Sequence, residues 1–373
     1  MLSMYLLLVM IANYAIITYR VSTSTAGLVS SVFIIGALIG RLYTGKKIDE
    51  HGAKRILLIG IFIFLIMSCF YFVPISIQTL IAIRFIQGIG IGVATTATST
   101  IVARIIPRTR MGEGISYFSI SVVLSTAIGP LIGVALLQRF SYVSIFIFSF
   151  TMGILCLLLA LMTRVPKSQT SIHDTKLFQL SSFFEPRAVP ISFVTFVIAF
   201  SYSGILSFIT AYAAEIDLLK AGGYYFFVYA LTMLITRPIT GRLMDKRGAN
   251  SVAYPTIVLY ALGMITLSQA TTSFTFLLAA VLIGLGYGNF QSCTQALALK
   301  RTPIERAGLA NSTYFIFLDL ALGVGPLLLG MLIPLFGFRG MYGSLTLVIV
   351  AGFFSYHLLH GKKDKELQRQ YHD

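Results

Sequence analysis

Two ionisable side chains lie inside apolar runs of this sequence, Arg84 in "IAIRFIQGIGIG" and Asp319 in "IFLDLALGVGP". A carboxyl group that is removed from water binds a proton more readily than a carboxyl group in water. A cation in a bilayer costs about 2.5 kcal/mol or more, so a charge at such a position usually has a functional role. We therefore expect Asp319 and Arg84 to take part in handling protons or charge.

Both residues lie well inside their runs. Arg84 is about six residues from the start of its run, or roughly 9 Å along a helix, and Asp319 is eleven residues in, or roughly 16 Å. Structural roles are the alternative. Arg84 could tie neighbouring helices together through backbone carbonyls or Gln87, and Asp319 could bond to Tyr314 or to a neighbouring helix.

Besides Arg84 and Asp319, the sequence contains a cluster of ionisable residues that occurs twice. The stretch "GKKIDEHGAKR", residues 45–55, gathers charge in a chain of which only 11% is charged. A similar stretch, "GRLMDKRGAN", begins at Gly241, 196 residues after Gly45. Matches at this offset indicate an internal duplication. They are Arg41 and Arg237, Asp49 and Asp245, Gly52 and Gly248, Gly88, Gly90 and Gly92 with Gly284, Gly286 and Gly288, and Gly129-Pro130 with Gly325-Pro326.

The elements that carry these residues are apolar runs long enough to cross a bilayer. The hydrophobic fraction is 57% and the mean hydropathy is +0.86. A helix of about 20 apolar residues spans the hydrocarbon core, and long runs exclude a membrane barrel. We predict an all-α polytopic membrane protein with twelve transmembrane helices, at residues 2–19, 25–45, 56–73, 78–103, 115–137, 142–163, 189–212, 221–243, 252–269, 273–299, 308–334 and 340–359.

The predicted spans form two pseudo-symmetric six-helix bundles, residues 1–163 and 189–360, joined by a linker at 164–188 and followed by a tail at 361–373. The first run lacks the early positive charge of a signal peptide, so we expect it to be retained. Of the 28 Lys and Arg residues, 21 fall on one set of connections and 4 on the other. This bias predicts that both termini and the linker are cytoplasmic.

Several chemistries are excluded by the residues themselves. The net charge of +15 follows the predicted topology, so it does not indicate nucleic-acid binding. The three cysteines stand singly, without metal or disulfide spacing, and no cofactor or metal site is expected. The run "GIGIG" lies inside a span, where close helix packing is favoured over nucleotide binding. We expect no enzyme activity, since no nucleophile and base converge at one depth.

The repeated stretches resemble known motifs. "GKKIDEHGAKR" is similar to motif A of the major facilitator superfamily, and "GRLMDKRGAN" is similar to its copy in the second half. "RFIQGIGIG", residues 84–92, resembles the fourth-span motif, and "STAIGPLIG", residues 125–133, resembles the Gly-Pro motif of exporters. The resemblance covers essentially the whole chain and implies twelve-helix, proton-coupled drug antiport. Glu50 and Ala53 depart from motif A, because basic residues are common at both positions.

The resemblance also implies roles for individual residues. It assigns Arg84 to proton coupling, and it makes the loop residues a conformational latch. The latch residues are Gly45, Asp49, Gly52, Arg55, Arg237, Gly241, Asp245 and Gly248, and helix bends are expected at Gly129, Pro130, Gly325 and Pro326. Asp319 is not assigned by a motif.

The family fold lines its substrate cavity with the first, fourth, seventh and tenth spans. Polar and aromatic residues of these spans are therefore substrate-contact candidates: Asn13, Tyr14, Thr95, Ser99, Tyr202, Tyr212, Asn289, Gln291 and Gln295. Gln291 and Gln295 share one helix face, and their partners at the offset of 196 are Thr95 and Ser99. Helix-bridging hydrogen bonds are the alternative role for each of these side chains.

Together these features predict a secondary transporter in a plasma membrane that exports amphiphilic small molecules by alternating access, with protons as the coupling ion. A transporter of a sugar, a peptide-like molecule or a metal-chelating metabolite is the second hypothesis. A membrane-embedded enzyme or scaffold is the third, and it leaves the repeated latch and the buried charges unexplained. We expect a monomer in contact with lipid and without nucleic acid.

Overall fold

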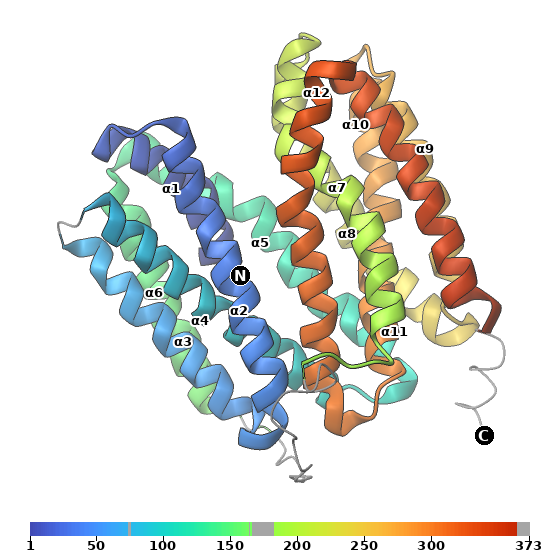
Figure 1. Cartoon of the computed structure of the whole chain (residues 1–373), viewed down its shortest axis with the longest axis horizontal. Helices are drawn as coiled ribbons and strands as arrows, with labels where there is room; N and C mark the ends of the chain where they lie inside the picture. Colours follow the sequence, from blue (N-terminus) through green and yellow to red (C-terminus); the bar gives the residue numbers. More distant parts are fainter. Residues whose placement is uncertain (74–75, 164, 166–182, 364–373) are drawn as a thin grey trace. The chain divides into compact units, whose positions relative to one another are not determined.

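The computed structural model describes residues 1–373 except 74–75, 164, 166–182 and 364–373 (Figure 1). Most of the predicted linker and tail therefore lies outside the described residues. The described chain is helical, and its main elements are α1 (Leu2–Tyr19), α2 (Thr23–His51), α3 (Ala53–Cys69), α4 (Ile77–Ile105), α5 (Met111–Arg139), α6 (Tyr142–Met162), α7 (Val189–Glu215), α8 (Leu219–Arg247), α9 (Asn250–Ser268), α10 (Ser273–Ile283), η4 (Gly284–Gly288), α11 (Asn289–Lys300) and α12 (Ala307–Leu359).

Each of the twelve predicted spans falls on a helical segment of the structure. The tenth span is shared by α10, the π-helical segment η4 and α11. The last two spans fall on α12, which is interrupted at Gly337 with φ 65° and ψ 175°. Figure 1 shows α12 as two arms joined by a sharp turn. A residue without a Cβ adopts this positive φ with little strain.

Nine helices of the described chain are long and apolar enough to cross a membrane, and α1 makes a tenth if its two bent segments count as one span. One of the nine is the long α12, which covers two predicted spans. The 29-residue α8 falls short of this test, and it carries buried Arg237 and several tyrosines. The structure is that of an all-α polytopic membrane protein.

The chain divides into two compact units. Unit 1 comprises Met1–Ile105, Ser121–Glu185 and Pro303–Ile316, and unit 2 comprises Ile106–Ile120, Pro186–Thr302 and Phe317–Asp373. Each unit thus includes a short piece from the other half of the sequence. The piece Ile106–Ile120 and the piece Pro303–Ile316 correspond to each other at the offset of 196, as Pro107 does to Pro303.

The duplication is also visible in the helix boundaries. Several helix boundaries recur 196 residues later. The end of α1 corresponds to the end of α7, the two ends of α2 correspond to those of α8, and the start of α4 corresponds to the start of α10. One departure stands out, because α4 is a continuous α-helix whereas the equivalent path in unit 2 passes through the π-helical η4.

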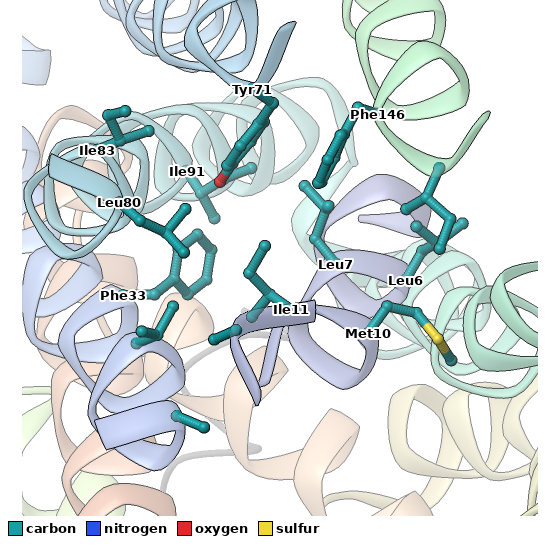
Figure 2. Close-up of a cluster of buried hydrophobic side chains, with 14 of the residues drawn as sticks. Leu6, Leu7, Met10, Ile11, Phe33, Tyr71, Leu80, Ile83, Ile91 and Phe146 are labelled. Carbon is teal, nitrogen blue, oxygen red and sulfur yellow. The ribbon is translucent and has the colours of Figure 1, made fainter. Parts of the chain in front are cut away.

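Glycines set the close packing inside unit 1. A Cβ on Gly88 or Gly92 would collide with the backbone of Phe33 or Ala37 in α2, so these glycines let α4 lie directly against α2. Beside this contact lies a hydrophobic core cluster. Figure 2 shows Leu6, Phe33, Ile91 and Phe146 among the side chains that meet in it.

Candidate functional site

Arg84 is the centre of a buried polar network in unit 1. Its side chain is fully buried, and its Nη1 donates to Gln87 Oε1 at 2.8 Å. The Tyr71 hydroxyl donates to the same amide oxygen at 2.8 Å, and Gln87 Nε2 donates to Ser68 Oγ at 3.0 Å. The Gln87 side-chain oxygen therefore accepts two hydrogen bonds, from Arg84 and from Tyr71, and these fix the orientation of the amide. The amide in turn holds the guanidinium of Arg84 in place.

The guanidinium of Arg84 also lies 4.2 Å from the centre of the Phe33 ring, in a cation–π contact. Its Nε and Nη2 have no hydrogen-bond partner among the residues that the structure describes. Figure 2 shows Phe33 and Tyr71 at the border of the hydrophobic cluster, with the Tyr71 hydroxyl directed into its interior. A buried cation with unused donors is costly unless an acceptor reaches it.

Asp319 lies in α12 and belongs to unit 2, whereas Arg84 belongs to unit 1. Its side chain is half-buried. The two proton-coupling candidates are thus held by separate units, each within an apolar helix.

The substrate-contact candidates of unit 1 have different surroundings. Asn13 is exposed, and Tyr14 packs its ring against Tyr142 and Phe146 at centroid distances of 5.2 and 5.1 Å. Thr95 and Ser99 are buried on one face of α4. Thr95 Oγ1 donates to the carbonyl of Ile91 at 2.8 Å, so its hydroxyl is used within its own helix.

The Ser99 hydroxyl donates to Asn311 Oδ1 at 3.0 Å, and both residues belong to unit 1. Asn311 is fully buried in the piece Pro303–Ile316. Sequence reasoning did not single it out. An amide inside an apolar run is the signal that could have identified it.

In unit 2, Tyr202 stacks on Tyr287 with ring centroids 4.0 Å apart and an interplanar angle of 15°. Tyr202 also lies 5.7 Å from the Tyr229 ring. Tyr212 is fully buried elsewhere in the unit, where its hydroxyl donates to the carbonyl of Leu267 at 3.0 Å. The structure therefore brings Tyr202 into an aromatic group, and it gives Tyr212 a backbone partner.

Asn289 bridges α11 and α8. Its Nδ2 donates to Thr236 Oγ1 at 2.9 Å, and its Oδ1 accepts from Thr240 Oγ1 at 2.9 Å. Gln295 is buried and Gln291 is half-buried on the same helix. This arrangement gives Asn289 the helix-bridging role that was the alternative for all of these side chains.

The C-terminal end of α8 binds the first turn of α5. Asp245 accepts hydrogen bonds from the backbone N–H groups of Gly112 and Glu113, at 2.9 and 2.8 Å, and its carboxylate lies 3.1 Å from Lys300 Nζ. A carboxylate at a helix N-terminus satisfies unpaired donors and complements the helix dipole. Arg242 adds an ion pair of 2.7 Å to Glu113.

Two glycines make matching close contacts. A Cβ on Gly241 would lie 2.6 Å from Ser116 Oγ, and a Cβ on Gly45 would lie 2.5 Å from Ser312 Oγ. Ser116 and Ser312 are themselves 196 residues apart. Each unit therefore uses the same device, a glycine that admits a serine of the piece contributed by the other half of the sequence.

The remaining latch residues lie around these contacts. Gly52 and Gly248 end α2 and α8, both with φ of 85°, a conformation that favours glycine. Arg237 is buried, and its Nη2 donates to the carbonyl of Gly288 at 3.0 Å. Arg55 is exposed, and the side chain of Asp49 lies outside the described part of the chain.

The two departures from motif A have simple surroundings. Glu50 forms an exposed ion pair of 2.7 Å with Lys47, one turn earlier on α2. Ala53 is buried in a hydrophobic cluster of unit 1 at the start of α3. A basic side chain at Ala53 would have to displace that cluster.

Helix α5 continues through positions 129 and 130, and α12 continues through Gly325 and Pro326. A Cβ on Gly129 would lie 3.0 Å from the backbone nitrogen of Leu6, and one on Gly325 would collide with Ser203. Both glycines therefore permit close contact with the helix that begins their sequence half. The marked interruption of α12 is at Gly337, eleven residues after Pro326.

A family model described as Major Facilitator Superfamily matches residues 1–317 and 191–371. An uncharacterised MFS-type transporter of Methanocaldococcus jannaschii is 26% identical over 88% of each chain. A riboflavin transporter of Clostridioides difficile is 23% identical over 82% of this chain and 79% of its own length. A multidrug resistance efflux pump of Streptococcus pneumoniae is 25% identical over 87% of this chain and 83% of its own length.

Solved structures show the same fold. A human organic anion transporter superposes with a TM-score of 0.81 at 16% identity, covering 95% of each chain. The E. coli fucose:proton symporter superposes with a TM-score of 0.75 at 15% identity, covering 96% of each chain.

Proposed function

The chain belongs to the Major Facilitator Superfamily, and from this premise we propose that it exports amphiphilic small molecules in exchange for protons. As a member of this family it is a multi-pass membrane transporter of small molecules and not an enzyme. The relative named a multidrug resistance efflux pump supports the exporter proposal. The proposal places the protein in the plasma membrane with both termini in the cytoplasm.

The observation that carries the proposal is the state of Arg84. It is fully buried, it is positioned by Gln87, and two of its donor nitrogens lack a partner among the described residues. A cation held in this way stabilises a negative charge that arrives in its surroundings. A transport cycle supplies such a charge when a carboxylate loses its proton.

Asp319 is our candidate for the proton carrier. It is a half-buried carboxyl in an apolar helix. Its protonation and deprotonation would change the charge of the apolar interior by one unit, which biases any conformational equilibrium that alters the exposure of the group. Arg84 and Asp319 then act as separate charge sites of one cycle.

The latch would control that cycle. Asp245 holds the first turn of α5, and Gly241 admits Ser116 beside it. Gly45 and Ser312 repeat the glycine contact in unit 1. Alternating access requires contacts that form in one state and break in the other. These small-residue and helix-end contacts suit that task, because no large side chain has to repack.

Transport into everted membrane vesicles tests the proposal. With an inward-acid pH gradient, the wild type should accumulate a fluorescent amphiphilic dye, and collapse of the gradient should stop accumulation. Asp319→Asn should abolish the dependence on the gradient. Glu215→Gln is the matched control, since Glu215 is an exposed acid at the end of α7 and should leave transport unchanged. Gradient-dependent transport that persists in Asp319→Asn contradicts the role of Asp319.

A metabolite transporter is the second candidate function. A relative is named a riboflavin transporter, and unit 2 contains the half-buried Tyr202, whose ring stacks on that of the buried Tyr287. A sugar, a peptide-like molecule or a metal-chelating metabolite fits less well, since stacking favours flat rings. Vesicle uptake of riboflavin, compared with uptake of the amphiphilic dye, distinguishes the two candidates.

A further inference from the structure

Five tyrosines of unit 2 form one group, which we name the tyrosine cluster: Tyr202, Tyr225, Tyr229, Tyr260 and Tyr287. They come from α7, α8, α9 and η4. The Tyr287 ring lies 4.0 Å from the Tyr202 ring and 5.6 Å from the Tyr260 ring, measured between centroids. The Tyr202 and Tyr229 rings are 5.7 Å apart. Tyr202 is half-buried, and the other four are buried.

The hydroxyl groups of this cluster are not all used. Tyr225 and Tyr260 are fully buried, and their hydroxyls have no hydrogen-bond partner in the described part of the chain. The Tyr260 ring contacts Tyr287, which stacks on Tyr202, and Tyr225 lies one helical turn before Tyr229, whose ring is also next to Tyr202. Two unsatisfied donors thus belong to a cluster of which one member, Tyr202, is partly exposed.

Unit 1 shows that packing does not require these hydroxyls. At the offset of 196, the five tyrosines correspond to members of the hydrophobic core cluster of unit 1: Leu6, Val29, Phe33, Phe64 and Ile91. Figure 2 shows Leu6, Phe33 and Ile91 with their side chains gathered in that core. The same helical framework is therefore filled by five apolar side chains in one unit and by five phenols in the other.

The backbone of unit 2 is also modified at this place. Tyr287 lies in the π-helical η4, whereas Ile91 lies in the regular α-helix α4. A Cβ on Gly286 would lie 2.5 Å from the backbone nitrogen of Tyr260, so this glycine lets η4 lie against α9. Short π-helical segments occur frequently at functional sites. Here the segment sets Tyr287 between Tyr202 and Tyr260.

From these observations we infer that the tyrosine cluster binds an uncharged planar heteroaromatic molecule. One face of the ligand stacks on Tyr202, and acceptor atoms on its edge, such as ring nitrogens or carbonyl oxygens, receive hydrogen bonds from Tyr225 and Tyr260. Phenol hydroxyls are neutral donors, so they match neutral acceptors. This site names a substrate class for the proposed transporter and in that sense rests on the proposed function.

Binding to the purified full-length protein in lipid nanodiscs tests the inference, with lumichrome, an uncharged fluorescent alloxazine, as the probe. The wild type should quench the fluorescence of lumichrome in a saturable manner, since the ring stacks on tyrosine. Tyr225→Phe and Tyr260→Phe should each weaken binding by about tenfold, the factor expected for one lost buried hydrogen bond. Tyr202→Leu, which restores the residue type of unit 1, should remove the quenching.

Tyr356→Phe is the matched control. Tyr356 is fully buried in the same unit, but its hydroxyl already donates to Asn250 Oδ1 at 2.9 Å, so its loss should leave lumichrome binding unchanged. Thermal unfolding without ligand provides an independent readout. Tyr225→Phe and Tyr260→Phe should unfold at the wild-type temperature or above, because no partner within the described chain is lost.

Equal affinity in the wild type and in both phenylalanine variants would overturn the inference, as would the absence of saturable binding to the wild type. If a phenylalanine variant unfolds at the wild-type temperature or above, misfolding does not explain its weaker binding. A wild type that fails to bind lumichrome and still exports an amphiphilic dye against the pH gradient removes this site and leaves the proposed function standing. A wild type that binds lumichrome but transports neither lumichrome nor the dye supports the binding site and contradicts the proposed function.

Discussion

Unit 1 and unit 2 place different polar groups at equivalent positions of a duplicated framework. Unit 1 carries Arg84 and Gln87 in α4, where unit 2 has Ala280 and Ile283 at the offset of 196. Unit 2 carries the tyrosine cluster where unit 1 has aliphatic side chains and phenylalanine. The backbone repeat is thus compatible with a buried guanidinium and amide at one set of positions in unit 1 and with phenols at another set of positions in unit 2.

The largest effect is expected from removing the charge of unit 1. Arg84→Gln should lower proton-driven transport by about tenfold or more, which corresponds to losing a charge-assisted hydrogen bond of about 1.5–3 kcal/mol. The unfolding temperature should stay the same or rise, because a desolvated charge with unused donors disappears. Vesicle transport and thermal unfolding check the two parts. A strongly destabilised protein would show that Arg84 is mainly a structural residue.

The cores can be compared by exchanging one residue type. Phe64→Tyr gives unit 1 the residue that unit 2 has at Tyr260. Phe64 is buried among apolar side chains, so the new hydroxyl should destabilise the protein by about 1–3 kcal/mol. The reverse change, Tyr260→Phe, should not. If denaturant unfolding finds equal effects for the two variants, the interiors do not differ in the way described.

The close glycine contact near the ends of α2 and α8 is repeated in both units, so its disruption should have comparable effects. Gly241→Val forces a side chain against Ser116 and the carbonyl of Gly112, and we expect a loss of about 1–3 kcal/mol. Gly223→Val is the control, because nothing lies within 4 Å of its added Cβ. Both are helical glycines of α8. Similar unfolding midpoints for the two variants would show that the Ser116 contact can relax.

A smaller effect is expected at the helix cap of unit 2. Asp245→Asn keeps an acceptor for the N–H groups of Gly112 and Glu113 but removes the charge that faces Lys300. A stability loss of about 1 kcal/mol follows from typical cap energies. Glu305→Gln, which changes an exposed acid, serves as the comparison. If Asp245 belongs to a latch, Asp245→Asn should lower the transport rate by a larger factor than its loss of stability explains.

The smallest effect belongs to the corresponding helix end of unit 1, the last turns of α2. Glu50 stands where unit 2 has Lys246, and it forms an exposed pair with Lys47. Glu50→Lys should change stability by less than about 1 kcal/mol, as is usual for exposed ion pairs. A larger loss, measured at low and high salt, would reveal a contact of Glu50 beyond this pair.

The fold could be predicted from the sequence because apolar run lengths and the offset of 196 are local or simple patterns. The interruption of α12 at Gly337 falls in the gap between the predicted spans 308–334 and 340–359. The piece that each unit takes from the other half of the sequence depends on tertiary contacts, which no run of residues encodes alone. Gln87 was named in advance as a partner for Arg84, but Tyr71 and Ser68 were not, since they approach from α3 and the turn after it.

The tyrosine cluster escaped prediction, apart from Tyr202, for a physical reason. Tyrosine counts as an apolar residue in a hydropathy pattern, and its hydroxyl leaves the pattern unchanged. The cluster becomes visible only when positions 196 residues apart are compared. Unit 2 then has tyrosine at five positions where unit 1 has leucine, valine, isoleucine or phenylalanine. Asn289 illustrates the reverse case, because a polar residue at a predicted substrate-facing position is used to join α11 to α8.

The pieces Ile106–Ile120 and Pro303–Ile316 have a consequence for how the protein is made. Unit 1 begins at Met1 and includes the piece Pro303–Ile316, so it stays incomplete until most of the chain has been synthesised. Unit 2, by contrast, includes a segment that is synthesised before the rest of it. Two separately expressed halves, cut between residues 163 and 189, would each lack part of a unit, and we expect them to become stable only when they are produced together.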